Sequence, residues 1–170
     1  SINANIGNTA KADGSALTIK TNAVPVTVKN LKLTGGNSTG NGGGLNVVIG
    51  GSLNGKRTLT LGDGTSSNPL SVTENKGLNG GGVYVEAYTC TINDYVSITS
   101  NSAVKSGDNT GDGGGVYANT NFLYVKGGTI ASNTADRNGG GISDGTSSCK
   151  TFIFGSACIG ASSASDPATS

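Results

Sequence analysis

Three consecutive glycines occur four times in this 170-residue chain, each time directly before a short apolar run. The copies are NGGGLNV (41–47), NGGGVYV (79–85), DGGGVYA (112–118) and NGGGISD (138–144). Glycine loses more backbone entropy on folding than any other residue, so a folded chain keeps such a triplet only where the backbone needs it. We therefore predict one corner that recurs in a repeating fold. The predicted corner glycines are Gly42, Gly43, Gly44, Gly80, Gly81, Gly82, Gly113, Gly114, Gly115, Gly139, Gly140 and Gly141.

An asparagine forms the second repeated feature, because it follows a short apolar stretch in each repeat. These residues are Asn8, Asn37, Asn75, Asn101 and Asn133. They are roughly 30 residues apart, within the period of about 20 to 50 residues that is typical of solenoids. Asparagine tolerates the left-handed conformation and bonds to nearby backbone groups. We predict that the five side chains stack as a ladder that turns the chain and bonds through its amides.

Each repeat divides into three short stretches with the period-2 alternation of half-buried strands. The first stretches are 17–20, 45–49, 83–86, 116–119 and 142–144, and the second are 26–28, 58–61, 89–92, 122–125 and 151–154. The third are 31–33, 70–72, 96–98, 129–130 and 158–159. Alternation assigns to the inward side Leu17, Leu45, Val47, Leu59, Leu61, Leu70, Val72, Val83, Val85, Cys90, Ile92, Val96, Ile98, Val116, Leu123, Val125, Ile130 and Ile142.

Stacking is the way in which such units bury their apolar sides, because a single coil cannot do so alone. The sequence predicts an all-β, right-handed parallel β-helix of about five three-stranded coils. It would form a single domain over residues 1–160, followed by a polar tail over 161–170. An antiparallel β-sandwich or barrel is the main structural alternative. That alternative leaves unexplained why the triplet and the asparagine recur in the same order.

Composition excludes several classes of protein. Charged residues make up 12% of the chain and the formal net charge is +1, so nucleic acid and anionic membranes are not expected partners. No apolar run is long enough to span a bilayer, and the absence of histidine excludes a Ser-His-Asp triad. An odd cysteine count argues against a disulfide framework. Cys149 and Cys158 either pair with each other or act, like Cys90, as small buried hydrophobes.

The stretch GGTIASNTADRNGGGISD (127–144) resembles the GGTI-x-x-N-T-A…GGG[VI] repeats of bacterial surface β-helix proteins. Similar repeats occur in autotransporter adhesins and chlamydial polymorphic outer-membrane proteins. The resemblance covers about residues 2 to 160. It implies a β-helix fold and an extracellular or cell-surface location. It implies little about activity, because the repeat is a scaffold that carries many functions.

Catalytic and metal-binding chemistry is weakly indicated. Most acidic residues stand beside Gly, Asn or Ser in predicted turns, and none recurs at matching places on neighbouring strands as paired glycosidase carboxylates would. We predict no catalytic residues and no cofactor. Asp108, Asn109 and Asp112 offer hard oxygen ligands for Ca²⁺, so a calcium site remains open. The Thr-x-Thr pairs at 58–60 and 89–91 are too few for an ice-binding array.

Two further features bear on function. Tyr84 and Tyr117 are predicted to stack outward, either as a contact surface for a partner or glycan or as a pair that only stabilises the sheet. The chain begins and ends in the same phase of the repeat, so we expect either part of a longer solenoid or a subunit that stacks end to end. We expect a non-enzymatic, extracellular structural protein, a filament subunit or part of an adhesin. The alternative is a carbohydrate-binding or carbohydrate-cleaving β-helix.

Overall fold

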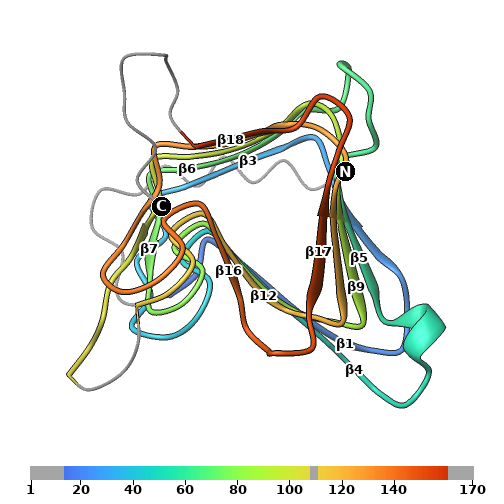
Figure 1. Ribbon diagram of the computed structural model, residues 1–170, viewed down its shortest axis with the longest axis horizontal. Coiled ribbons are helices and arrows are strands. Elements are labelled where there is room, and N and C mark those ends of the chain that lie inside the picture. Colours follow the sequence, from blue (N-terminus) through green and yellow to red (C-terminus); the bar gives the residue numbers. More distant parts are fainter. Residues whose placement is uncertain (1–13, 108–110, 161–170) are drawn as a thin grey trace.

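The chain winds into a right-handed parallel β-helix of five coils (Figure 1). The computed structural model describes residues 14–107 and 111–160. Coil 1 contains β1 (Leu17–Asn22), β2 (Val26–Val28) and β3 (Leu31–Thr34), and coil 2 contains β4 (Leu45–Gly50), β5 (Thr58–Leu61), β6 (Leu70–Thr73) and β7 (Lys76–Gly77). Coil 3 contains β8 (Val83–Glu86), β9 (Thr89–Ile92), β10 (Val96–Thr99) and β11 (Ser102–Ala103). Coil 4 contains β12 (Val116–Asn119), β13 (Phe122–Val125), β14 (Thr129–Ala131) and β15 (Thr134–Ala135), and coil 5 contains β16 (Ile142–Asp144), β17 (Lys150–Ile153) and β18 (Cys158–Gly160).

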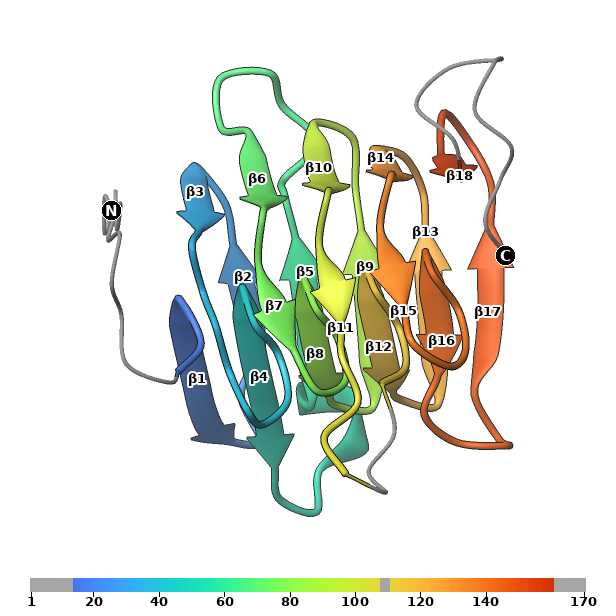
Figure 2. The same ribbon diagram turned by 90° about the vertical axis from the view of Figure 1, so that its left-hand side faces the viewer.

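Three five-stranded sheets run along the solenoid, and every strand pairs in parallel with its counterpart in the next coil. They are the β1 sheet (β1-β4-β8-β12-β16), the β2 sheet (β2-β5-β9-β13-β17) and the β3 sheet (β3-β6-β10-β14-β18). Figure 2 shows the coils side by side along the solenoid. The strands stay in register because a slip by one residue would turn every inward side chain outward.

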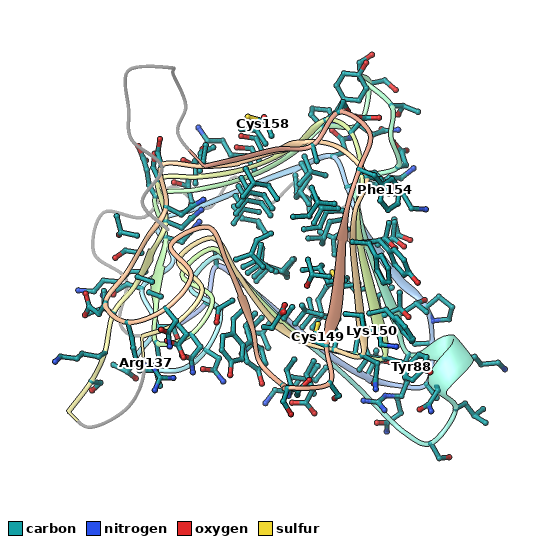
Figure 3. All side chains as sticks on the ribbon, viewed as in Figure 1. Tyr88, Arg137, Cys149, Lys150, Phe154 and Cys158 are labelled. Atoms are coloured by element: carbon teal, nitrogen blue, oxygen red, sulfur yellow. The ribbon has the colours of Figure 1, made fainter. Side chains whose placement is uncertain are left out.

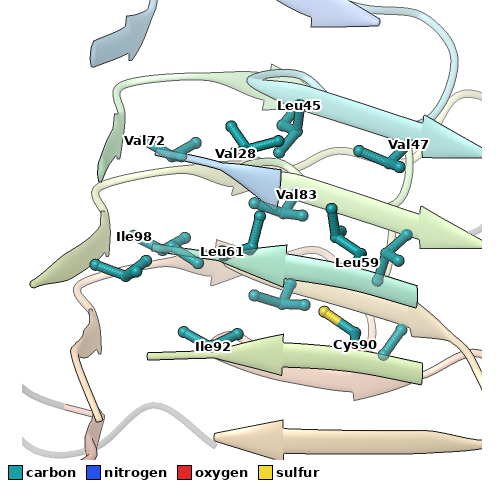
Figure 4. Packing of buried hydrophobic residues seen from close by; sticks show 14 of the residues in the cluster. Val28, Leu45, Val47, Leu59, Leu61, Val72, Val83, Cys90, Ile92 and Ile98 are labelled. Carbon is teal, nitrogen blue, oxygen red and sulfur yellow. The ribbon is translucent and has the colours of Figure 1, made fainter. Parts of the chain in front are cut away.

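The core consists of columns of like side chains, one from each coil (Figure 4). In the β1 sheet Leu45 pairs with Val83, and Val83 with Val116. Every inward residue predicted from coils 2 to 4 is buried. Leu17 and Ile142, in the two outermost coils, are only partly buried. The alternation of apolar and polar residues was therefore sufficient to identify the core, since each strand has only two sides.

A fourth, short sheet was missed by the prediction of three strands per coil. It consists of β7, β11 and β15, two residues each, and it lies between the asparagines and the glycine corners. Two residues are too few to show a period, so alternation could not reveal these strands.

The glycines of each triplet are required for different reasons, as the corner at 80–82 shows. Gly80 has φ +66°, a conformation that side chains disfavour. A Cβ on Gly81 would lie 2.3 Å from the backbone carbonyl of Ser102 in β11, and one on Gly82 would lie 2.8 Å from the side-chain nitrogen of Asn101. The triplet is thus one turn residue followed by two residues against which neighbouring groups pack closely.

Helical structure in the described residues is confined to a single 3-10 turn, η1 (Asn54–Lys56), in the connection between β4 and β5. Within the described ranges, no helix has the length and apolar character needed to cross a bilayer.

Candidate functional site

Three buried asparagines form a hydrogen-bonded ladder along the solenoid. The side-chain amide of Asn75 donates to Oδ1 of Asn101 at 3.0 Å, and that of Asn101 donates to Oδ1 of Asn133 at 3.0 Å. The same oxygens also accept from the backbone N–H groups of Asn75 and Asn101, at 3.1 and 2.9 Å. Each amide therefore satisfies backbone and side-chain groups in the neighbouring coil, and these residues are at most 3% exposed.

The prediction that Asn37 belongs to this ladder is wrong. Its place is taken by Gly36, whose backbone N–H donates to Oδ1 of Asn75 at 2.9 Å, while Asn37 is exposed. The residue in the left-handed conformation at this turn is the one directly before the ladder position, not the asparagine itself. It is Glu74 at φ +57° in coil 2 and Gly35 at φ +71° in coil 1. Counting from that residue shifts the ladder position from Asn37 to Gly36. Asn8 lies outside the described residues.

A second polar ladder runs along the residues that precede the glycine triplets, and sequence reasoning missed it. The side-chain amide of Asn79 donates to Oδ1 of Asn41 at 3.1 Å, and the backbone N–H of Asp112 donates to Oδ1 of Asn79 at 3.1 Å. The backbone N–H of Asn138 donates to Oδ1 of Asp112 at 3.0 Å. The repeated Asn or Asp before each triplet was the signal for this ladder.

Asp112 is neutralised within the chain. The Arg137 guanidinium donates to both of its carboxylate oxygens, through Nε at 2.9 Å and through one terminal nitrogen. This contact lowers the pKa of the Asp112 carboxyl. The Asp112 carboxylate therefore already pairs with a cation, Arg137, which makes it a poorer ligand for Ca²⁺. The other two proposed ligands, Asp108 and Asn109, lie outside the described residues. Among the residues that are described, no three His, Cys, Asp or Glu side chains gather as a metal site would require.

Tyr84 and Tyr117 stack as predicted, with ring centroids 5.6 Å apart and planes 8° from parallel. Tyr84 is nevertheless only 8% exposed, so it does not form an open contact surface. Its hydroxyl donates to Glu86 at 3.4 Å, and burial raises its pKa. In its outward column Tyr84 lies between Asn46 of coil 2 and Tyr117 of coil 4.

Partly exposed and exposed aromatic side chains gather instead on the outer side of the β2 sheet. The rings of Phe122 and Tyr124 stack with centroids 6.3 Å apart, and those of Tyr124 and Phe152 with centroids 5.3 Å apart. Tyr88 meets Phe122 edge-on at 5.6 Å. The strands were predicted from the sequence, but the prediction did not align these rings across neighbouring coils.

The two outermost coils present the edges of all three long sheets. At the coil 1 edge, Leu17, Ile19 and Leu31 border a cavity of about 700 Å³. At the coil 5 edge, Ile153 and Ile159 occupy inward columns and are 56% and 36% exposed. Both edges therefore offer strands and apolar side chains that the described residues do not cover completely.

Polar groups interrupt the apolar interior at the coil 5 edge. Asp144 stands in the inward column of Ala118, and Thr151 in that of Leu123. The Thr151 hydroxyl donates to Oδ1 of Asp144 at 2.8 Å. An inward-pointing charge is one of the devices that discourage indiscriminate pairing at a sheet edge.

All three cysteines are free thiols. Cys90 is fully buried, and burial raises its pKa to about 12. Cys149 is partly buried, whereas Cys158 is exposed. The prediction of a small buried hydrophobe is thus confirmed for Cys90 and wrong for Cys158. The alternative, a disulfide between Cys149 and Cys158, is not formed.

Comparison with known proteins gave no match to any family model, curated protein or solved structure.

Proposed function

We propose that this chain is a non-enzymatic, extracellular structural protein whose copies stack end to end, as a filament or as part of a surface adhesin. The observation that carries the proposal is the pair of sheet edges at coils 1 and 5, both bordered by partly exposed apolar residues. Strand edges are templates for pairing with another chain. The extracellular location rests on the resemblance of the repeat to those of bacterial surface proteins.

Side chains at the two edges match if coil 5 of one copy pairs in register with coil 1 of the next. The column of Leu17 in coil 1 is that of Ile142 in coil 5, so these two residues would meet. Leu33 would likewise meet Ile159. A head-to-tail contact of this kind does not close on itself and generates an open fibre.

Asp144 weakens this contact, because the stack would bury its carboxylate opposite Ile19 of the next copy. Burying a charge costs several kcal/mol unless it is fully compensated. The chain therefore stacks only at high local concentration, and Asp144→Ala, which restores the residue type of coil 4, associates at least about tenfold more tightly.

Site-specific cross-linking tests the proposed register. Lys32 in β3 shares a column with Cys158 in β18, so in a stack these residues stand on adjacent strands. Adjacent strands are about 4.8 Å apart, within the Cα separation of about 4.4–6.8 Å that a disulfide needs. Oxidised Lys32→Cys should form a series of disulfide-linked oligomers in non-reducing electrophoresis.

The matched control is Lys20→Cys, an equally exposed lysine of coil 1 whose column holds Val48 and Glu86 and no cysteine. It should give dimers at most. The proposal fails if Lys32→Cys also stops at dimers and if the wild-type chain sediments as a monomer at the highest concentration that it tolerates.

A further inference from the structure

All three phenylalanines of the chain lie on the outer side of the β2 sheet rather than in the core. Phe152 and Phe154 are 42% and 48% exposed. Soluble proteins rarely expose contiguous apolar surface without an interaction that uses it. The narrow interior, filled by Val, Leu and Ile, explains why the rings are not inside, but not why they share one face.

Two adjacent rows make up this surface, which we call the aromatic–basic face. In coil 4 the outward residues are Phe122, Tyr124 and Lys126, and in coil 5 they are Lys150, Phe152 and Phe154. Phe122 is in register with Lys150, and Tyr124 with Phe152. Figure 3 shows Tyr88, Lys150 and Phe154 along the outer side of β17 and its neighbours.

Hydroxyl groups continue the face through the earlier coils. Thr27, Thr60 and Thr91 form one outward column that leads to Tyr124, and Thr58 and Thr89 form the neighbouring column that leads to Phe122. The β2 sheet thus presents a strip along the solenoid with hydroxyls at one end and rings with two ammonium groups at the other. Five strands at about 4.8 Å spacing make the strip roughly 20 Å long.

We propose that the aromatic–basic face binds a linear polysaccharide that carries carboxylate groups, a polyuronate. The partly exposed rings offer an apolar surface against which the C–H groups of sugars can pack. Lys126 and Lys150, both exposed, supply the positive charge that complements uronate carboxylates. The threonine columns offer hydrogen bonds to sugar hydroxyls further along a linear chain. Asp94, beside Gly127 at the border of the face, is held by the Ser156 hydroxyl.

Nucleic acid fits the face less well, although aromatic and basic groups also bind single strands. Single-strand binding requires ring faces on which successive bases can stack. Here the rings of Phe122, Tyr124 and Phe152 lie within 14° of parallel to their neighbours, at 5.3 and 6.3 Å, and cover each other's faces. No base can enter between rings at that separation.

Binding of the full chain to alginate, a polyuronate, tests the proposal, with neutral dextran and single-stranded oligo(dT) as comparison polymers. Two double variants, Phe152→Ala/Phe154→Ala and Lys126→Ala/Lys150→Ala, should each weaken alginate binding by about tenfold or more. The control Lys20→Ala/Lys32→Ala removes the same charge from other faces and should change it less than about twofold. Circular dichroism melting shows that the variants fold, as truncation of exposed side chains leaves the core intact.

The proposal is overturned if the phenylalanine variant binds alginate like the wild type, or if all lysine variants weaken binding equally, which would indicate charge alone. Equal affinity for oligo(dT) would also overturn it. End-to-end stacking is a separate question, because the Lys32→Cys cross-link reports on the coil edges whether or not alginate binds.

Discussion

Replacing Asn101 with alanine removes the central member of the asparagine ladder. The side chain is 1% exposed, donates to the Val72 carbonyl at 2.9 Å and accepts from the Asn75 backbone N–H at 3.1 Å. Alanine leaves that N–H and that carbonyl without these buried partners. Each buried group left unsatisfied costs about 1–3 kcal/mol, so we expect a loss of about 2–6 kcal/mol in the free energy of unfolding.

Thermal unfolding followed by circular dichroism measures this loss. For a chain of this size, 1 kcal/mol corresponds to roughly 2–4 °C, so a central value of about 4 kcal/mol lowers the Tm by about 8–16 °C. The control is Asn37→Ala, which changes an exposed residue with the same sequence context and should stay within about 0.5 kcal/mol of wild type. Equal shifts for the two variants would refute the assignment of the ladder to the buried asparagines.

Further predictions concern the corner, the ion pair and the buried thiol. Gly81→Ala forces a methyl group to 2.3 Å from neighbouring backbone and should cost at least about 2 kcal/mol in urea unfolding, whereas Gly55→Ala meets nothing within 4 Å and should cost much less. Arg137 lowers the pKa of Asp112 in the folded chain. The contribution of this ion pair to the free energy of unfolding is therefore complete above the carboxyl pKa of the unfolded chain, about 3.9, and is lost as pH falls through the lower pKa of the folded chain. The stability advantage of wild type over Arg137→Ala should thus be constant from about pH 7 to 5 and shrink below about pH 4, unless the pair is broken in solution. Cys90 should be alkylated only after unfolding, as read by peptide mass spectrometry, and labelling of the folded chain would contradict its burial.

Sequence patterns were sufficient for the fold because the apolar side chains alternate and recur. Leu59, Cys90 and Leu123 were each assigned inward from their own strand, and all three are buried in one column. Once the strands were assigned, the order of the repeats along the chain was enough to predict that equivalent strands stack in parallel.

Features that depend on exact alignment between coils were harder to predict. Asn37 matches the other ladder asparagines in context, but one residue more separates it from its strand, and Gly36 fills the position. Tyr84 was assigned outward, yet alternation within one strand does not show how deeply an outward side chain is buried between its neighbours in the adjacent coils. The aromatic–basic face likewise depends on which residue of β17 pairs with Phe122, which no single strand specifies.

Asn75 and Asn101 make equivalent bonds to the following coil, and this equivalence bears on how such a chain changes length. Residues 76–101 constitute one complete turn that enters and leaves at the same ladder position. Deleting that segment would bring Asn75 into the place of Asn101, with Asn133 still next in line. The length of the solenoid can therefore change by whole turns of about 4.8 Å each without breaking the asparagine ladder. A change by part of a turn would remove a ladder position from its place.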